Sequence, residues 1–320
     1  MDNLIFSLNA TIPVFLVMVI GYVLKNINVL DDSFVKTLNS FNYKVTLPIL
    51  VFKDISESDF LQVWDTSYVL FCFCSTLFCI IVTWIITAKV SKKKDLVGEF
   101  VQASYRSSAA ILGIAFIQNI YGTSGMAPLM IIGTVPLYNV AAVIILSLTK
   151  PCDNMEKETS LSVFTLKTCV KDIITNPIIL GILAGMIVSV LPVSFPTMIN
   201  KTVHSLASIA SPLALLGLGA GFQGKKALAK IKPTLICSFM KLLLWPALFL
   251  PIALFMGFNG EKLVAILVML GSPTTASCYI MAKNLKHEGI LTSSVVVATT
   301  FLSSLTLTFW LYLLKSMGAI

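Results

Sequence analysis

Residues 263–282 read LVAILVMLGSPTTASCYIMA, a stretch of twenty residues with no charged side chain. An α-helix needs roughly 20 mainly apolar residues to cross the hydrocarbon core of a membrane. Near its centre the stretch contains Gly271, Ser272 and Pro273. Ser272 is a suitable N-cap and Pro273 a suitable first helical residue, so the sequence predicts that a new helix begins there, in mid-membrane.

Similar apolar segments recur along the whole chain. Of its 320 residues, 57% are hydrophobic and only 12% are charged, and the mean hydropathy of +0.90 is too high for a soluble domain of this size. We therefore predict an all-α integral membrane protein with ten transmembrane helices. The predicted segments are Ala10–Ile27, Leu38–Lys53, Ser67–Ala88, Phe100–Tyr121, Ala127–Leu148, Ile174–Leu191, Met198–Phe222, Pro233–Phe258, Lys262–Asn284 and Ile290–Leu314.

The lysines fall mainly in alternate loops between these segments. Three clusters lie at 89–94, 150–171 and 225–232, whereas the other loops contain single lysines such as Lys53 and Lys201. Because cytoplasmic loops collect Lys and Arg, we expect both termini to lie outside, in a plasma or inner membrane. Lysine-rich loops beside anionic lipid also explain the net charge of +8 without a nucleic-acid partner.

The two halves of the chain share a proline and glycine pattern. Three pairs of residues have the same offset of 164 positions: Pro13 and Pro177, Gly21 and Gly185, Pro48 and Pro212. Five helices in each half make the second half inverted relative to the first, as in many secondary transporters. We therefore expect a first repeat over 1–150, a cytoplasmic linker over 151–173 and a second repeat over 174–320.

Such transporters bind their substrate near the midplane, where broken helices expose backbone groups. The break at Ser272, Pro273, Thr274 and Thr275 would place the positive end of a helix dipole there, which favours an anion. The ninth segment corresponds to the fourth, which we expect to supply the other half of the site. The candidates in the fourth segment are Arg106, Ser107 and Ser108.

Arg106 is the strongest candidate for binding an anion. An arginine within a membrane costs at least roughly 2.5–3.5 kcal/mol on insertion scales and is usually kept for a partner, a cavity or a ligand. Its guanidinium suits a carboxylate. Two interpretations stay open, because Arg106 could instead extend to the membrane edge. For Lys44 and Lys241 we expect that second arrangement.

Other polar residues within the segments are less specific. Asn42 and Asn139 either line the cavity or join helices by hydrogen bonds. No carboxylate is clearly placed at mid-depth, so a coupling ion is not identified, and no cysteine pair has zinc-like spacing. We expect no cofactor, no metal and no enzymatic activity, because no nucleophile and base are paired at depth.

Several of these stretches resemble the auxin efflux carrier family, which includes bacterial malate-permease-like proteins and the plant PIN-FORMED carriers. The resemblance is carried by 271–276 with Tyr279 and 281–283, by 42–48, and by Pro136 with Asn139. It implies ten helices in two inverted repeats, crossing broken helices four and nine, and transport of small carboxylates. The family commonly has asparagine where this chain has Ser108 and proline where it has Ala115.

The predicted function is alternating-access transport of a small organic anion, such as malate or an auxin-like acid, by secondary active transport or uniport. The alternative is a membrane receptor that binds such an anion on a transporter fold. The expected partners are the anion and the lipid bilayer, with a homodimer as a further possibility.

Overall fold

Apolar helices make up most of the protein. The computed structural model describes residues 2–57, 64–91, 94–109, 117, 120–121, 126–149, 175–191, 195–222 and 224–320. The predicted linker over 151–173 and most of the second half of segment four, with Ala115, lie outside these residues. In the described parts of the chain, no β-strand occurs. The fold is that of an all-α integral membrane protein.

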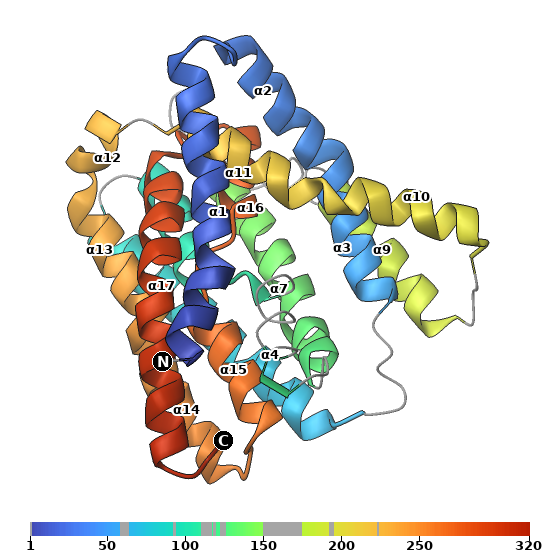
Figure 1. Ribbon diagram of the computed structural model, residues 1–320, viewed down its shortest axis with the longest axis vertical. Helices are drawn as coiled ribbons and strands as arrows, with labels where there is room; N and C mark the ends of the chain where they lie inside the picture. Colours follow the sequence, from blue (N-terminus) through green and yellow to red (C-terminus); the bar gives the residue numbers. More distant parts are fainter. Residues whose placement is uncertain are drawn as a thin grey trace, which may run out of the picture.

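The described residues of the first half form long helical stretches and a shorter helix, α5. Figure 1 shows their arrangement. Long α4 and α7 match predicted segments three and five closely. Helix α1 begins eight residues before predicted segment one, and α5 covers only the beginning of segment four. The bounds are α1 Asp2–Asn26, α2 Asp32–Phe41, the π-helical turn η1 Asn42–Thr46, α3 Leu47–Ser56, α4 Thr66–Val90, α5 Lys94–Tyr105 and α7 Ala127–Leu148.

The second half covers its five predicted segments in the same way. Its bounds are α9 Pro177–Val190, α10 Thr197–Ser208, α11 Ala210–Ala220, α12 Gly224–Ala229, α13 Ile231–Phe239, the π-helical turn η3 Met240–Leu244, α14 Trp245–Phe255, α15 Glu261–Gly271, α16 Ser277–Asn284 and α17 Ile290–Ser316. Five helices in the described residues are long and apolar enough to cross a membrane, and shorter apolar helices accompany them.

Large apolar side chains cover much of the outer surface. Phe255 is 94% exposed and Val90 78% exposed, and Phe301 and Tyr312 of α17 are also largely exposed. Hydrocarbon rather than water is the solvent in which such a surface is stable. The outer faces of the helices therefore suit a lipid environment.

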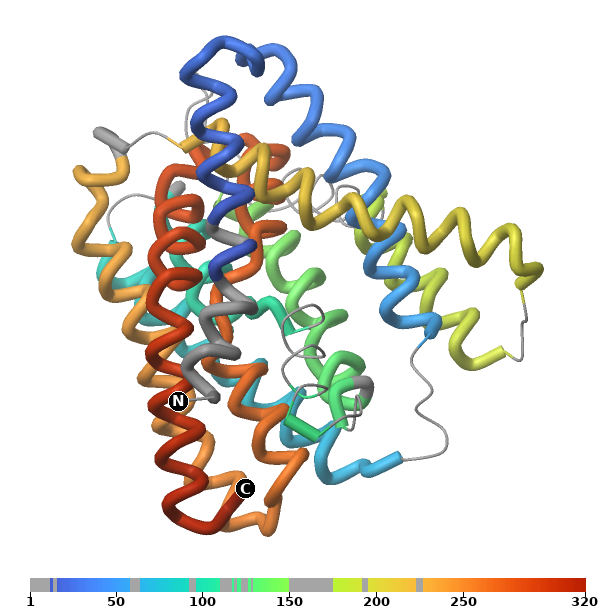
Figure 2. Tube along the Cα trace, viewed as in Figure 1, coloured from blue at the N-terminus to red at the C-terminus, as the bar shows by residue number. Residues whose placement is uncertain are grey.

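Two helix pairs approach each other so closely that glycine is required at the contact. Gly21 of α1 lies directly against the backbone of Leu216 in α11, and Gly185 of α9 lies against Phe52 in α3, where a Cβ would be 2.9 Å from the carbonyl oxygen. Small residues allow this kind of packing between membrane helices. Figure 2 shows both pairs, with α1 crossing α11 and α3 running beside α9.

Two helices end inside the bundle rather than at its surface. Helix α5 ends at Tyr105, and α15 ends at Gly271. The backbone amide of Ser108 donates to the carbonyl of Pro273 (3.0 Å), so the two interruptions contact each other directly. This contact brings together the predicted site residues of segments four and nine.

Candidate substrate-binding site

A cavity of about 120 Å³ lies beside the two interruptions. Six of the predicted site residues line it: Arg106, Ser107, Ser108, Asn139, Thr274 and Thr275. The other polar lining residues are Asp54, Tyr138, Ser211, Ser277 and Thr300. The rest of the wall is apolar and comes from Leu47, Leu50, Val51, Val135, Ile178, Ala214, Leu215, Ala276 and Val296.

Arg106 is held inside the protein by neutral groups. It is only 3% exposed. One terminal nitrogen donates to Asn139 Oδ1 (2.9 Å) and Ser277 Oγ (3.0 Å), and the other contacts Met281 Sδ (2.6 Å). Among the described residues, Arg106 forms no ion pair and its Nε has no acceptor. The cavity therefore contains a positive charge that no described carboxylate neutralises, and Arg106 does not extend to the membrane edge.

The end of α5 is stabilised by side chains from the second half of the chain. The last carbonyls of a helix lack partners within it. Here the carbonyl of Ala103 accepts from Thr274 Oγ1 (2.7 Å), that of Ser104 from Trp245 Nε1 (3.1 Å), and that of Tyr105 from Lys241 Nζ (3.3 Å). Without these partners, a helix end buried in the membrane would be costly.

The interruption in the ninth segment differs in detail from the prediction. Ser272 ends α15 as its C-cap, and α16 begins only at Ser277, with Ala276 as N-cap. The prediction that Ser272 is an N-cap and Pro273 the first helical residue was therefore wrong. Helical geometry is disfavoured for the residue before a proline, here Ser272. A side chain of α17 stabilises the extended chain that follows, since Thr274 N donates to Thr299 Oγ1 (3.1 Å).

Three predicted site residues do not line this cavity. Asn42 donates to the carbonyl of Ala210 (3.1 Å) and accepts from Thr46, so it joins η1 to α11. Ser272 is completely buried, and its Oγ has no partner among the described residues. Pro273 takes part through its carbonyl, which accepts from Ser108 N.

Asp54, Tyr138, Ser277 and Thr300 contribute to the cavity but were not among the predicted site residues. Asp54 follows the predicted end of segment two at Lys53, whereas it lies in α3 and lines the cavity. Tyr138 is buried, and its hydroxyl lies 3.1 Å from Ser107 Oγ. Ser277 could have been found, because it belongs to the same polar interruption as Thr274 and Thr275. Thr300 gave no signal beyond being a hydroxyl in an apolar helix.

The two lysines that were expected to extend to the membrane edge, Lys44 and Lys241, differ from each other. Lys44 is exposed, as expected. Lys241 is completely buried, so the expectation that it extends to the membrane edge was wrong. It lies in η3, and its three acceptors are backbone carbonyls of α5 and α15.

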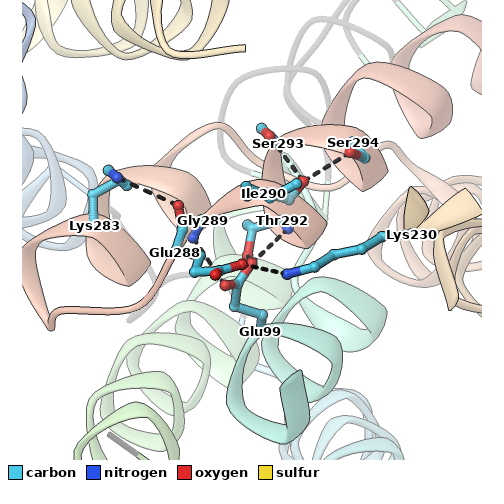
Figure 3. Close-up of polar contacts among 9 residues, drawn as sticks. All are labelled: Glu99, Lys230, Lys283, Glu288, Gly289, Ile290, Thr292, Ser293 and Ser294. Carbon is cyan, nitrogen blue, oxygen red and sulfur yellow. Dashed lines mark hydrogen bonds and ion pairs between the residues drawn. The ribbon is translucent and has the colours of Figure 1, made fainter. Parts of the chain in front are cut away.

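A buried carboxylate anchors α5 to the start of α17 (Figure 3). Glu99 is 1% exposed. It accepts from the backbone amides of Gly289 (2.8 Å) and Thr292 (2.9 Å) and from the hydroxyl of Thr292 (3.0 Å). The first N–H groups of a helix lack internal partners and carry a partial positive charge. Glu99 therefore caps α17 from another helix, next to the exposed ion pair of Lys230 and Glu288 (2.6 Å).

The described residues contain no group of three or more His, Cys, Asp or Glu side chains that could hold a metal ion. The polar groups of the cavity are instead one guanidinium, one carboxylate, hydroxyls and an amide. These groups can bind and orient a small molecule by charge and hydrogen bonds.

Comparison with known proteins agrees with a transport role. The family described as membrane transport protein matches residues 6–311. A protein of Methanocaldococcus jannaschii described as an uncharacterized transporter is 23% identical over 315 residues, which cover 96% of this chain and 98% of that protein. The chain therefore belongs to the membrane transport protein family, which is the family of the auxin efflux carriers, as its helix-two, helix-five and helix-nine motifs indicate.

Proposed function

We propose that the protein carries a small organic anion across the membrane by alternating access, with Arg106 as the group that binds the negative charge. The observation that carries this proposal is a buried guanidinium in a cavity, bonded only to neutral groups among the described residues. A charge in a low-dielectric site is costly unless it is paired. An anionic substrate would supply the missing pair.

The hydrogen-bond geometry supports a carboxylate. Nε of Arg106 is buried and has no acceptor among the described residues, so one donor of the guanidinium is unsatisfied. Hydroxyls of Ser107, Thr275 and Ser277 belong to the same cavity wall. Arg–carboxylate pairs are frequently bidentate, and charge-assisted hydrogen bonds are roughly twice as strong as neutral ones.

The rest of the lining favours one negative charge over two. Among the described residues of the wall, Arg106 and Asp54 are the ones with acidic or basic side chains. Asp54 supplies no positive charge that could pair with a second anionic group, while Leu47, Val51 and Ile178 offer apolar surface to the body of a substrate. Among carboxylates, we therefore expect a monocarboxylate with an apolar body to bind better than a dicarboxylate.

For the transport cycle, we propose two inverted five-helix repeats over 1–150 and 174–320 that rock against each other. The two glycine contacts support this arrangement, because Gly21 and Gly185 have an offset of 164, and so do their partners Phe52 and Leu216. Helix pairs α1–α11 and α3–α9 are thus equivalent under one exchange of the halves. Transporters with such repeats expose a midplane site to each side in turn.

The test is uptake of labelled monocarboxylates and dicarboxylates into liposomes that contain the purified protein. Arg106→Gln should lower uptake about 10- to 100-fold, because it removes charge-assisted hydrogen bonds worth about 1.5–3 kcal/mol. Lys44→Gln is the matched control, since it removes the same charge from an exposed position. Equal uptake by Arg106→Gln and wild type would contradict the proposal.

A receptor on the same fold is the second candidate function. Thermal stabilisation by an anion tests binding alone, because a ligand of the native state raises its stability. Stabilisation that depends on Arg106, together with no uptake of the same anion, would favour the receptor. Stabilisation together with uptake would favour the carrier.

A further inference from the structure

Lys241 has surroundings that are unusual for a lysine. Its side chain is completely buried, and among the described residues no carboxylate forms an ion pair with it. Nζ instead donates to the carbonyls of Leu270 (2.9 Å), Met269 (3.3 Å) and Tyr105 (3.3 Å). A lysine ammonium has three donors and no acceptor, so three carbonyls match the charged form completely.

These carbonyls belong to the ends of two helices that stop inside the protein. Tyr105 is the last residue of α5, and Met269 and Leu270 lie in the last turn of α15. The C-terminal end of a helix carries roughly half a negative elementary charge. Two such ends together amount to about one negative charge, which a single ammonium neutralises. A water molecule could donate hydrogen bonds to these carbonyls but could not supply the positive charge.

The local backbone holds Lys241 in position. It lies in the π-helical turn η3, and such turns are frequent at functional sites. Trp310 of α17 donates to the carbonyl of Leu242 in this turn (3.0 Å). One turn further along, Trp245 donates to the carbonyl of Ser104 (3.1 Å). Lys241 and Trp245 therefore bind the end of α5 from one face of the same helix.

Rings of backbone carbonyls are also how proteins bind alkali cations, because carbonyl oxygens replace the hydration shell of the ion. Ammonium and potassium are cations of similar size. We infer that the carbonyls of Tyr105, Met269 and Leu270 form a monovalent-cation site, and that the ammonium of Lys241 is its permanent, covalently attached occupant. The native protein then needs no sodium or potassium ion at this place.

This site supports the cavity without being part of it. Lys241 does not line the cavity. One of the three carbonyls that it binds, that of Tyr105, belongs to the residue before Arg106. Removing the ammonium leaves two negative helix ends next to the backbone that positions the guanidinium. Anion affinity should then fall, and this second consequence, unlike the cation site itself, rests on the proposed anion binding.

The experiment compares wild type with Lys241→Ala and Lys241→Met in thermal unfolding of the purified full chain, without any organic anion. The salts are KCl, NaCl and N-methylglucamine chloride at equal concentration. Lys241→Ala should unfold about 2–4 °C higher in potassium or sodium than in N-methylglucamine, once the metal ion is at roughly ten times its Kd. Wild type should show no such difference, and neither should Lys241→Met, because its side chain fills the space.

Propylammonium provides a second probe, since it resembles the part of the side chain that Lys241→Ala removes. It should stabilise Lys241→Ala but neither wild type nor the control Lys44→Ala. An absent or identical response in Lys241→Ala and wild type, to both metal ions and propylammonium, would overturn the inference whatever the protein transports.

Wild type decides the matter if neither variant can be purified. Its unfolding temperature should be the same in sodium, potassium and N-methylglucamine. The affinity of any anion that it binds should agree within twofold between the three salts. If wild type needed sodium or potassium for stability or for anion binding, the ends of α5 and α15 would need a metal ion. The role assigned to Lys241 would then be wrong.

Discussion

Arg106 and Lys241 are two buried positive charges with different partners. Side-chain oxygens and a sulfur surround Arg106, which lines the cavity, whereas backbone carbonyls surround Lys241. The partial charges of the acceptors explain the difference. The ends of α5 and α15 already balance Lys241, while Asn139 and Ser277 leave the charge of Arg106 available to a ligand.

Asn139→Asp tests this difference at a single atom. Asn139 Oδ1 is 2.9 Å from Arg106, so an aspartate there would neutralise the guanidinium with almost no change in shape. Anion affinity should fall at least about tenfold, because the new ion pair replaces the ligand. Thermal stability should change little, because the new ion pair offsets the lost bond from Asn139 Nδ2 to the carbonyl of Val135 (2.9 Å). Titration with the transported anion and a melting curve measure the two effects. Undiminished affinity would show that Arg106 does not bind the anion.

Asn42→Ala should have the opposite effect. Asn42 is completely buried and donates to the carbonyl of Ala210, outside the cavity. Its loss leaves that carbonyl without this donor, which costs about 1–3 kcal/mol of unfolding free energy. Anion affinity of the folded fraction should be unchanged. A loss of affinity without a loss of stability would place Asn42 in the site after all.

The residues that sequence could and could not identify differ in where their partners come from. Arg106 and the polar stretch over 272–275 were predicted as site residues because their chemistry conflicts with an apolar helix. Lys241 was misjudged, since its acceptors are the carbonyls of residues distant in the chain, and a carbonyl has no signature in the sequence. Asp54 was misjudged because α3 continues to Ser56, beyond the predicted end at Lys53.

At the scale of elements, helix caps taken from other helices hold the bundle together. Glu99→Gln removes the negative charge at the start of α17. It also replaces one of the two carboxylate oxygens that accept from three donors. Caps of this kind are worth about 0.5–2 kcal/mol, so the melting temperature should fall by several degrees. Glu288→Gln is the matched control beside it, because Glu288 is half exposed and its ion pair contributes little. Equal losses in both variants would contradict the role of Glu99.

Asp65 joins the starts of α4 and α15 and gives a dependence on pH. It accepts from Lys262 Nζ (2.6 Å) and from the backbone amide of Tyr68 (3.1 Å), and these bonds hold the pKa of Asp65 below its ordinary value of 3.8. The folded state therefore binds the proton more weakly than the unfolded state. The stabilisation is complete above pH 3.8 and is lost as the pH falls through the lower pKa of the folded state.

Asp65→Asn isolates this charge, because asparagine is an equally good N-cap. Wild type should melt at a higher temperature than Asp65→Asn by a constant amount between pH 5 and 7, and the difference should shrink below about pH 4. The same comparison in a Lys262→Met background should give a smaller difference at every pH. A difference that persists at low pH would have another origin.

Sequence predicted the helices more accurately than their interruptions. The bounds of α7 agree with the prediction at both ends, and those of α4 within two residues. Apolar length is a local property, so it can be read directly. The break after Tyr105 has no proline, and it is held by Thr274, Trp245 and Lys241, all of them more than 130 residues away.

For the whole molecule, the proposed equivalence of the two halves predicts matched effects of matched substitutions. Gly21→Ala and Gly185→Ala each force a methyl group against the backbone of another helix. Each should cost about 1–3 kcal/mol of stability, as overpacking does. Ile20→Ala and Ile187→Ala, on exposed faces of the same helices, should cost far less. A large effect in only one of the two glycine variants would contradict the equivalence.

Synthesis delivers the end of α5 long before the groups that stabilise it. The carbonyls of Tyr105, Ser104 and Ala103 precede their donors by 136, 141 and 171 residues. At about 5–20 residues per second, the ribosome needs roughly 7–35 s to supply them. Lipid has no donor for these carbonyls, so during this interval water or the insertion machinery must hold them. While only the first half has been made, the growing chain therefore depends on water or the insertion machinery to satisfy the end of α5.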